Sequence, residues 1–306
     1  MGFAAGVGFA NFDMLFSGIG EIPREGEEVY ARNFEIQLGG GVPATMINLS
    51  RLGEDARIIT FLGRDFFSRF VDAELKKYKV RYSNVYEGSK VPVVVTTAMI
   101  TKRDRTFMSY RAPIELSQEQ TEKIVQCLQG AAVVDMHLGF LEIYRKIQKS
   151  GGTRFVFDTG WSDDLTIENT KEYLELADFY TPNQKEALKI TGTDSLEKAA
   201  DALSEFFPEI IIKLDREGCY YRNNQTGRKL IIPPISNIRA VDSTGAGDAF
   251  LSGFLYGLLH GYDTPDCIRF GNVTGGACVQ GIGCLSSYVG KKELLDQAAG
   301  ITPRII

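Results

Sequence analysis

Short apolar segments that alternate with amphipathic helical patterns constrain the fold of this chain more than any other feature. Four segments rich in β-branched residues have the length of buried strands: residues 57–63, 131–139, 154–160 and 209–215. Helical patterns lie between them, at residues 44–53, 65–78 and 194–207. The apolar start of the chain, residues 1–16, indicates a first strand. Since strands that are apolar throughout need cover on both faces, the alternation predicts an α/β fold with a mostly parallel sheet between helices.

Two further segments break this alternation. Residues 27–40 and 91–110 are rich in β-branched and aromatic residues and have no helical pattern beside them. They indicate antiparallel strands, with the sequence KRDR at 102–105 as a hairpin tip. The basic residues in that tip, Lys102, Arg103 and Arg105, surround Asp104 and are typical of a solvated turn. We interpret the two segments as a small separate sheet that forms a lid, although extra edge strands of one sheet would give the same pattern.

Composition narrows the class of protein. The net charge of −5 is not that of a protein that attracts nucleic acid through a basic surface. Five cysteines, an odd number without a Cys-x-x-Cys pair, predict reduced thiols rather than disulfides or a zinc site. No apolar run approaches membrane-spanning length, and no basic residue precedes Arg24 as a secretory signal would require. We therefore expect a cytoplasmic protein that binds neither nucleic acid nor membrane.

The segment DSTGAGDAFLSGF, residues 242–254, carries the strongest chemical signal. Gly245, Ala246 and Gly247 lead into a helical pattern, so unpaired backbone N–H groups at a helix start would form an anion site. Asp248 follows at once; an acidic residue in a first helical turn is also an ordinary dipole partner. Phosphoryl transfer explains why both occur together, because the amides would hold developing charge while the carboxylate accepts a proton. The dipole leads us to expect that Asp248 is ionised at neutral pH.

This segment resembles the C-terminal signature of the ribokinase-like (PfkB) carbohydrate kinases. Residues 39–65 look like the N-terminal Gly-Gly motif of that family, and residues 181–192 are similar to its Asn-x-x-Glu element. The resemblance covers essentially the whole chain. It implies a ribokinase-like three-layer α/β/α fold with a main domain of residues 1–10, 38–90 and 113–306. The lid would comprise residues 11–37 and 91–112, and would form a homodimer interface as in several relatives.

The resemblance also implies an activity. The chain would transfer the γ-phosphoryl group of ATP, with Mg²⁺, to a primary hydroxyl of a sugar or sugar acid such as fructose or 2-keto-3-deoxygluconate. Asp248 would be the catalytic base beside an anion hole at residues 245–248. Asn183 and Glu186 would help to hold Mg²⁺ and the nucleotide phosphates, largely through water. The same pair, with Asn183 as N-cap and Glu186 at the third position, is also an ordinary helix cap.

Other positions carry over in the same way. The resemblance implies that Asp13, Gly39 and Gly40 contact the sugar. It implies that Lys213 and Gly218 contact the nucleotide and that Asn272 lies near the adenine pocket. It also implies that Asp242 and Thr244 belong to a loop that binds a monovalent cation, K⁺, in many members.

Three positions depart from the usual pattern. Ala44 stands where many sugar kinases carry an Asn, so a contact to the usual sugar would be lost. Asp215 stands where a Gly is common. Arg111 resembles an Arg of fructokinase and 2-keto-3-deoxygluconate kinase relatives, and could meet a carboxylate, a sulfonate or a polar sugar group. An ordinary salt bridge within the lid would explain Arg111 equally well.

Other functions are open at this point. A nucleoside kinase of the same family, or a kinase-derived sensor that binds a sugar without turnover, fits most of these residues. A Rossmann dehydrogenase does not, because the segment GVGFAN at residues 6–11 lacks the last glycine of the dinucleotide fingerprint. Both histidines, His137 and His260, are isolated in the sequence, and we interpret them as structural.

Overall fold

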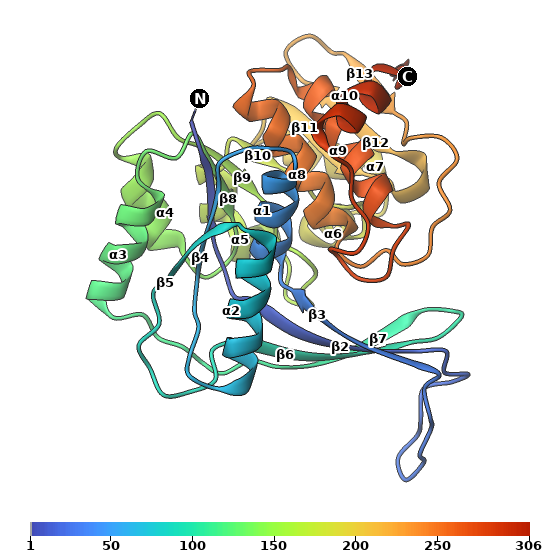
Figure 1. Ribbon diagram of the computed structural model, residues 1–306. Coiled ribbons are helices and arrows are strands. Elements are labelled where there is room, and N and C mark those ends of the chain that lie inside the picture. The colour runs from blue at the N-terminus through green and yellow to red at the C-terminus, as the bar shows by residue number, and fades with distance from the viewer. Residues whose placement is uncertain (1) are drawn as a thin grey trace.

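A six-stranded sheet forms the centre of the computed structural model, which describes residues 2–306 (Figure 1). Its strand order is β10-β9-β8-β1-β4-β5, and every neighbouring pair is parallel. The strands are β1 (Ala4–Val7), β4 (Ala56–Thr60), β5 (Arg81–Asn84), β8 (Val133–Met136), β9 (Arg154–Phe157) and β10 (Phe179–Tyr180). Parallel pairing brings the carboxyl ends of all six strands to one edge, where ligands bind in open α/β sheets.

Helices cover both faces of this sheet. Successive residues of each strand point to opposite faces, so Ala4 and Ile58 belong to one hydrophobic core while Ala5 and Ile59 belong to the other. The first core is closed by α1 (Gly41–Arg51), α2 (Phe66–Tyr78), α8 (Ala246–Leu259), α9 (Thr264–Cys278) and α10 (Lys291–Ala299). The second is closed by α3 (Gln118–Leu128), α4 (Leu141–Gln148), α5 (Ile167–Leu176), α6 (Gln184–Thr191) and α7 (Leu196–Leu203). The expected three-layer α/β/α fold is confirmed.

A second, antiparallel sheet continues beyond the edge strand β10. It has the order β11-β12-β13-β14, with β11 (Glu209–Lys213), β12 (Cys219–Asn223), β13 (Lys229–Ile232) and β14 (Arg304–Ile305). A bond from the Lys213 amide to the Pro182 carbonyl, 2.9 Å long, joins it to the chain after β10. The predicted strand at 209–215 therefore exists, but its ladder partner is antiparallel.

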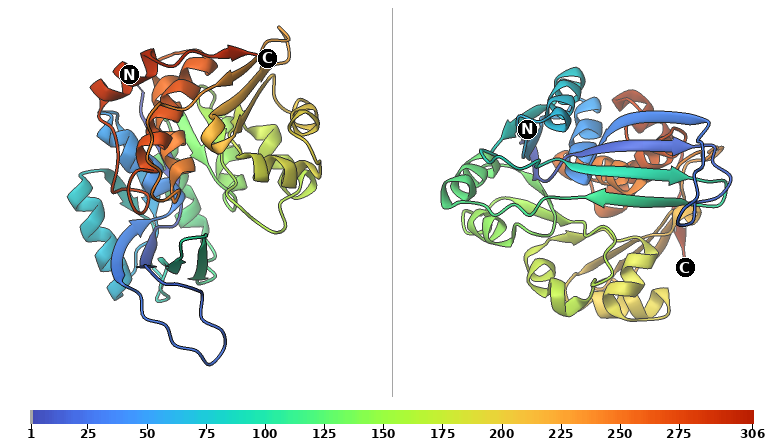
Figure 2. Two further views of the ribbon diagram at one scale, coloured as in Figure 1. Left: turned by 90° about the vertical axis from the view of Figure 1, so that its right-hand side faces the viewer. Right: turned by 90° about the horizontal axis from the view of Figure 1, so that it is seen from below.

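The lid is a separate sheet, as expected, and not an extension of the central one. Its order is β3-β2-β6-β7, with β2 (Asn11–Ser17), β3 (Asn33–Gly39), β6 (Val94–Ile100) and β7 (Arg105–Tyr110). Figure 2 shows the four strands side by side beneath the main layers. The outer pairs are antiparallel, as expected for the segments 27–40 and 91–110, and the central pair β2 and β6 runs parallel. The first 16 residues also hold two strands rather than one, because the chain passes from β1 in the central sheet to β2 in the lid.

Very close packing of α8 against α9 fixes the helix that follows the Gly-Ala-Gly loop. A Cβ placed on Gly253 would lie 2.3 Å from the carbonyl oxygen of Phe270, and one on Gly257 would lie 2.6 Å from the sulfur of Cys267. Neither position leaves room for a side chain, so the two helix backbones hold α8 rigidly. The start of α8 is therefore held in a fixed position.

No helix within residues 2–306 is both long and apolar enough to span a membrane. All five cysteines are free, and four of them are buried. The cytoplasmic location expected from the sequence stays a prediction.

Candidate active site

The loop before α8 presents bare backbone, as the sequence predicts. Gly245 is the N-cap of α8 and has a φ of 74°, a conformation that favours glycine. A Cβ there would lie 2.1 Å from the Cβ of Cys284. Among residues 2–306, the amides of Gly247 and Asp248 have no hydrogen-bond acceptor, whereas the Ala246 amide makes a long bond of 3.3 Å to the Ser243 carbonyl. Two free N–H groups at the positive end of a helix form an anion site.

Asp248 stands in a cluster of charged side chains that come from β8, β11, α6, α8 and the residues that directly follow β8 and β9. The cluster consists of Asp135, His137, Asp158, Glu186, Lys213 and Asp248. Burial raises the pKa of Asp248 to about 7; Asp158 and Asp135 add to this rise, and His137 and Lys213 oppose it. The expectation of a fully ionised carboxylate at neutral pH is therefore wrong, because burial outweighs the helix dipole. A pKa near 7 suits a general base at neutral pH.

Lys213 places a cation beside the anion loop. Its Nζ lies 3.3 Å from Oδ2 of Asp158 and 3.3 Å from the point where a Cβ of Gly247 would be. Burial alone would lower the pKa of Lys213, but Asp158 and Glu186 more than offset it, so the pKa is raised. The ammonium group is therefore charged and able to pair with an anion held on the loop amides.

His137, which we had interpreted as an isolated structural residue, belongs to this site. Its Nε2 lies 2.9 Å from Oδ1 of the fully buried Asp135. Burial lowers the pKa of His137, but Asp135, Asp158 and Asp248 outweigh it and raise the pKa to about 9. A Cβ on Gly41 would lie 3.1 Å from Cε1 of His137 and 3.3 Å from Oδ1 of Asp248. An imidazolium cation thus flanks the candidate base at the start of α1.

The residues expected to hold a sugar converge on the same place. Oδ1 of Asp13, on β2, is buried and has no hydrogen-bond partner in the described chain. A Cβ on Gly39 would lie 2.0 Å from the other oxygen of Asp13, and one on Gly40, where φ is 100°, would lie 2.6 Å from the Phe9 carbonyl. Burial raises the pKa of Asp13 to about 6, although Asn11 and Thr96 lower it. An unpaired buried oxygen is costly unless a ligand donates to it, so Asp13 fits a hydroxyl-bearing ligand.

Ala44 and Arg111 differ in what they offer a substrate. Ala44 is buried in the core and contributes no polar group. The Arg111 guanidinium lies 4.1 Å over the ring of Phe9 and makes no ion pair within residues 2–306, so the alternative of a lid salt bridge is wrong. Phe9 thus has two neighbours of interest: its ring lies under Arg111, and its backbone carbonyl abuts Gly40 of the candidate sugar site.

Asn183 and Glu186 form a complete capping box at the start of α6. The Asn183 amide donates to Oε2 of Glu186 at 2.8 Å, and the Glu186 amide donates to Oδ1 of Asn183 at 2.9 Å. The structural role weighed above is confirmed, and a role in metal binding stays a prediction. Burial raises the pKa of Glu186, against the effect of Lys213. Within residues 2–306, no group of three or more His, Cys, Asp or Glu side chains is arranged to hold a metal ion.

The positions expected near the nucleotide meet at the end of β13. A Cβ on Gly218, where φ is 93°, would lie 2.1 Å from the Ile232 carbonyl. The Asn272 side chain donates to the carbonyls of Ile232 and Pro233 at 2.8 and 3.0 Å. Both bonds come from the side-chain nitrogen, so Asn272 holds the backbone at Ile232 and Pro233 in place. Asp215 adopts the left-handed conformation, with a φ of 50°, where the resemblance leads one to expect glycine.

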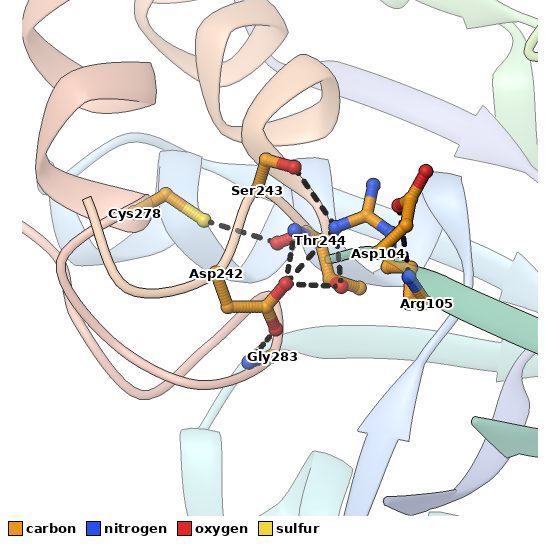
Figure 3. A network of polar contacts seen from close by, with 7 residues as sticks. All are labelled: Asp104, Arg105, Asp242, Ser243, Thr244, Cys278 and Gly283. Carbon is orange, nitrogen blue, oxygen red and sulfur yellow. Dashed lines mark hydrogen bonds and ion pairs between the residues drawn. The ribbon is translucent and has the colours of Figure 1, made fainter. Parts of the chain in front are cut away.

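The loop expected to bind a monovalent cation already contains a positive charge. Nη1 of Arg105, on β7 of the lid, lies 2.9 Å from Oδ1 of Asp242 and 3.0 Å from Oγ1 of Thr244 (Figure 3). The interpretation of Arg105 as part of a solvated turn is therefore wrong. The local sequence could not reveal this contact, because Arg105 and Asp242 are 137 residues apart. With a guanidinium on the carboxylate, Asp242 and Thr244 do not fit a free K⁺.

Comparison with known proteins agrees with the fold described above. A 5-dehydro-2-deoxygluconokinase from Clostridium perfringens is 26% identical over 284 residues, covering 83% of this chain and 81% of that protein. The structure of Arabidopsis thaliana ribokinase complexed with ribose and ATP has a TM-score of 0.81 at 23% identity, covering 97% and 98% of the two chains. That of Escherichia coli phosphofructokinase-2 in complex with potassium has a TM-score of 0.78 at 16% identity, covering 98% and 99%.

The match to a family covers most of the chain. Residues 11–289 match the pfkB family carbohydrate kinases, a range that includes the lid strands, the Gly-Gly segment and the Gly-Ala-Gly-Asp loop. Proteins of this family are sugar and nucleoside kinases, and ATP is their implied phosphoryl donor. The chain is an enzyme of this class and belongs to the pfkB family of carbohydrate kinases.

Proposed function

We propose that this enzyme transfers the γ-phosphoryl group of ATP to a primary hydroxyl of a sugar or sugar acid, such as fructose or 2-keto-3-deoxygluconate. The observation that carries this proposal is the position of Asp248. Its carboxylate adjoins the start of α1, where Gly39 and Gly40 border Asp13, and its own turn provides the free amides. A hydroxyl held on one side and a phosphoryl group held on the other would meet at Asp248.

The residues divide into three tasks. Asp13 and the bare backbone at Gly39 and Gly40 bind and orient the acceptor, since an unpaired carboxylate oxygen accepts from a hydroxyl. Asp248 accepts the proton of the attacking hydroxyl. The amides of Gly247 and Asp248 stabilise charge on the transferred group, together with the ammonium of Lys213. When bound near Asn183 and Glu186 through water, Mg²⁺ would supply further charge neutralisation at the phosphates.

Unpaired positive charge favours an acidic acceptor over a neutral one. The guanidinium of Arg111 has no anionic partner within the described residues 2–306. Arginine binds carboxylates through paired hydrogen bonds. Ala44 offers no amide to a neutral sugar such as ribose. The similarity to a 5-dehydro-2-deoxygluconokinase supports the same preference.

An assay of ADP release over ketoses, sugar acids, ribose and nucleosides tests the acceptor. We expect 2-keto-sugar acids to give the highest kcat/KM and ribose a low one. Efficient use of ribose would refute the acidic preference, and efficient use of nucleosides would identify a nucleoside kinase. Binding of a sugar without ADP release by any acceptor would favour a sensor.

The substitution Asp248→Asn tests the base with whichever acceptor is best. We expect kcat to fall by about 10²- to 10⁴-fold while ATP binding is retained, because only proton transfer is removed. Asp296→Asn, an exposed position on α10, is the matched control. Near-normal turnover of Asp248→Asn would remove Asp248 as the base.

The outer face of the lid supports the proposal of a homodimer. Four large apolar side chains exposed on the lid strands lie on one face of the sheet by strand register: Phe34, Ile36, Met108 and Tyr110. Such a patch is unusual on a monomer and fits a second copy of the same surface. Light scattering should give twice the mass of one chain, and Met108→Asp should reduce it to that of a monomer. Leu295→Asp, an exposed apolar position on α10, should not; a monomeric wild type would refute the dimer.

A further inference from the structure

Arg105 is the one lid residue whose charge is inserted into the loop that precedes the anion site. Its Nη1 contacts three successive residues of that loop, at 2.9 Å from Oδ1 of Asp242, 2.9 Å from Oγ of Ser243 and 3.0 Å from Oγ1 of Thr244. The Asp242 side chain is only 6% exposed. Figure 3 shows the guanidinium reaching from β7 to the side chains of Asp242, Ser243 and Thr244.

Asp242 is the centre of that loop. Its Oδ1 accepts from the amide and the hydroxyl of Thr244, at 2.9 and 2.7 Å, and its Oδ2 accepts from the Gly283 amide at 2.9 Å. The carboxylate therefore ties the segment before Gly245 to the segment around Gly283. Burial would raise the pKa of Asp242, but these bonds and Arg105 together hold it below its usual value, so the group is a carboxylate. A buried carboxylate needs a compensating cation.

The second of these segments supports the anion site directly. Cys284, next to Gly283, packs so closely on Gly245 that a Cβ there would lie 2.1 Å away. The lid also contacts this segment from its other edge, because Nε2 of Gln37 on β3 donates to the Ile282 carbonyl at 3.0 Å. Two lid strands thus contact the two loop segments that set the position of Gly245.

We propose that Arg105 is a built-in cation: its guanidinium takes the place of a free monovalent ion at Asp242, next to the anion site. Through this contact, Arg105 couples the shape of the loop at 242–248 to the position of the lid. Arg105 is a positioning residue, since it contacts the loop and not the reacting groups. Phosphoryl transfer by the wild type is consequently independent of K⁺.

The experiment compares wild type, Arg105→Ala and Arg103→Ala in KCl and in choline chloride at equal ionic strength. Arg103 lies on the same hairpin and is exposed, so its loss controls for hairpin charge. We expect equal kcat in both salts for the wild type and for Arg103→Ala. In Arg105→Ala we expect kcat to fall at least tenfold in choline chloride, and K⁺ to restore several-fold of the loss, because Asp242 is then free to bind the ion. Arg105→Lys, which keeps the charge, should fall less and respond little to K⁺.

Thermal unfolding supplies a readout that needs no turnover. K⁺ should raise the Tm of Arg105→Ala, and should not raise that of the wild type relative to choline chloride. Only the kinetic comparison rests on the proposed kinase activity. A K⁺-dependent Tm of Arg105→Ala would therefore support the built-in cation even if no acceptor were phosphorylated. Several-fold activation of the wild type by K⁺ would overturn the proposal. So would an Arg105→Ala variant that behaves like Arg103→Ala or that shows no response to K⁺ in either readout.

Discussion

Replacement of His137 by glutamine should move the pH at which the enzyme becomes active. Asp248 must be unprotonated to accept a proton, and its pKa of about 7 reflects burial, raised further by Asp158 and lowered by the His137 imidazolium. In the wild type, kcat/KM should therefore rise as pH increases through about 7 and level off above it. Below that midpoint it should fall about tenfold per pH unit.

The size of the shift follows from the geometry. His137 and Asp248 flank the same point at Gly41, at 3.1 and 3.3 Å. These two distances place the charges no more than about 6 Å apart, and at that separation, with an effective dielectric constant of about 20, they attract by about 3 kcal/mol, which corresponds to about 2 pKa units. Loss of the imidazolium should thus raise the pKa of Asp248 from about 7 toward 9. At pH 7, only about 1% of the variant would carry an ionised Asp248.

Kinetics between pH 6.5 and 9.5, with ADP release as the readout, measure this shift. At pH 7 we expect kcat/KM of His137→Gln to be about 50-fold below that of the wild type, and at pH 9 within a few-fold of the plateau. His260→Gln is the matched control, because His260 pairs with Glu54 and not with Asp248. A variant with reduced activity but an unchanged midpoint would refute the electrostatic role of His137.

Three further substitutions test other parts of the site. Glu186→Gln should raise the Mg²⁺ concentration for half-maximal activity by about 10- to 100-fold, as for other residues that hold a metal indirectly; an unchanged titration would contradict the role of Glu186. Gly245→Ala should lower the Tm by several degrees in scanning calorimetry, because the new Cβ would lie 2.1 Å from that of Cys284 and overpacking costs about 1–3 kcal/mol. Gly39→Ala should raise KM for the acceptor and not for ATP, because its Cβ would lie 2.0 Å from Asp13; equal changes in both would argue against that assignment.

The local sequence pattern predicts the layers of the fold, but it does not predict how all of the strands pair. The alternation of strands and helices depends on period and burial, which are properties of a few neighbouring residues, and the three-layer arrangement follows from it. The direction of pairing between β2 and β6 does not, because about 80 residues separate the two strands and both alternatives satisfy the same pattern. For the same reason the strand at Glu209–Lys213 was predicted, but its place in an antiparallel sheet was not.

The same distinction between local and long-range features applies to the candidate site. Gly245, Ala246, Gly247 and Asp248 could be predicted, because their chemistry lies within one turn at a helix start. The pKa of Asp248 could not, since burial and the neighbouring charges come from strands distant in the chain. Arg111 could be singled out, but only the structure excludes an ion pair within the described chain.

The sequence does carry a signal for His137 and Asp158. Each follows the last residue of a buried parallel strand, Met136 of β8 and Phe157 of β9, and ligand sites lie at the carboxyl ends of such strands. A charged side chain directly after a predicted central strand is therefore a candidate site residue, even without a motif. This rule does not predict the contact of Arg105 with Asp242. Arg105 lies on a strand of a different sheet, and the contact depends on where that sheet lies. The helix start at Gly245 and the ends of β8 and β9 can therefore be located from the sequence, whereas the contact of Arg105 with Asp242 requires the three-dimensional structure.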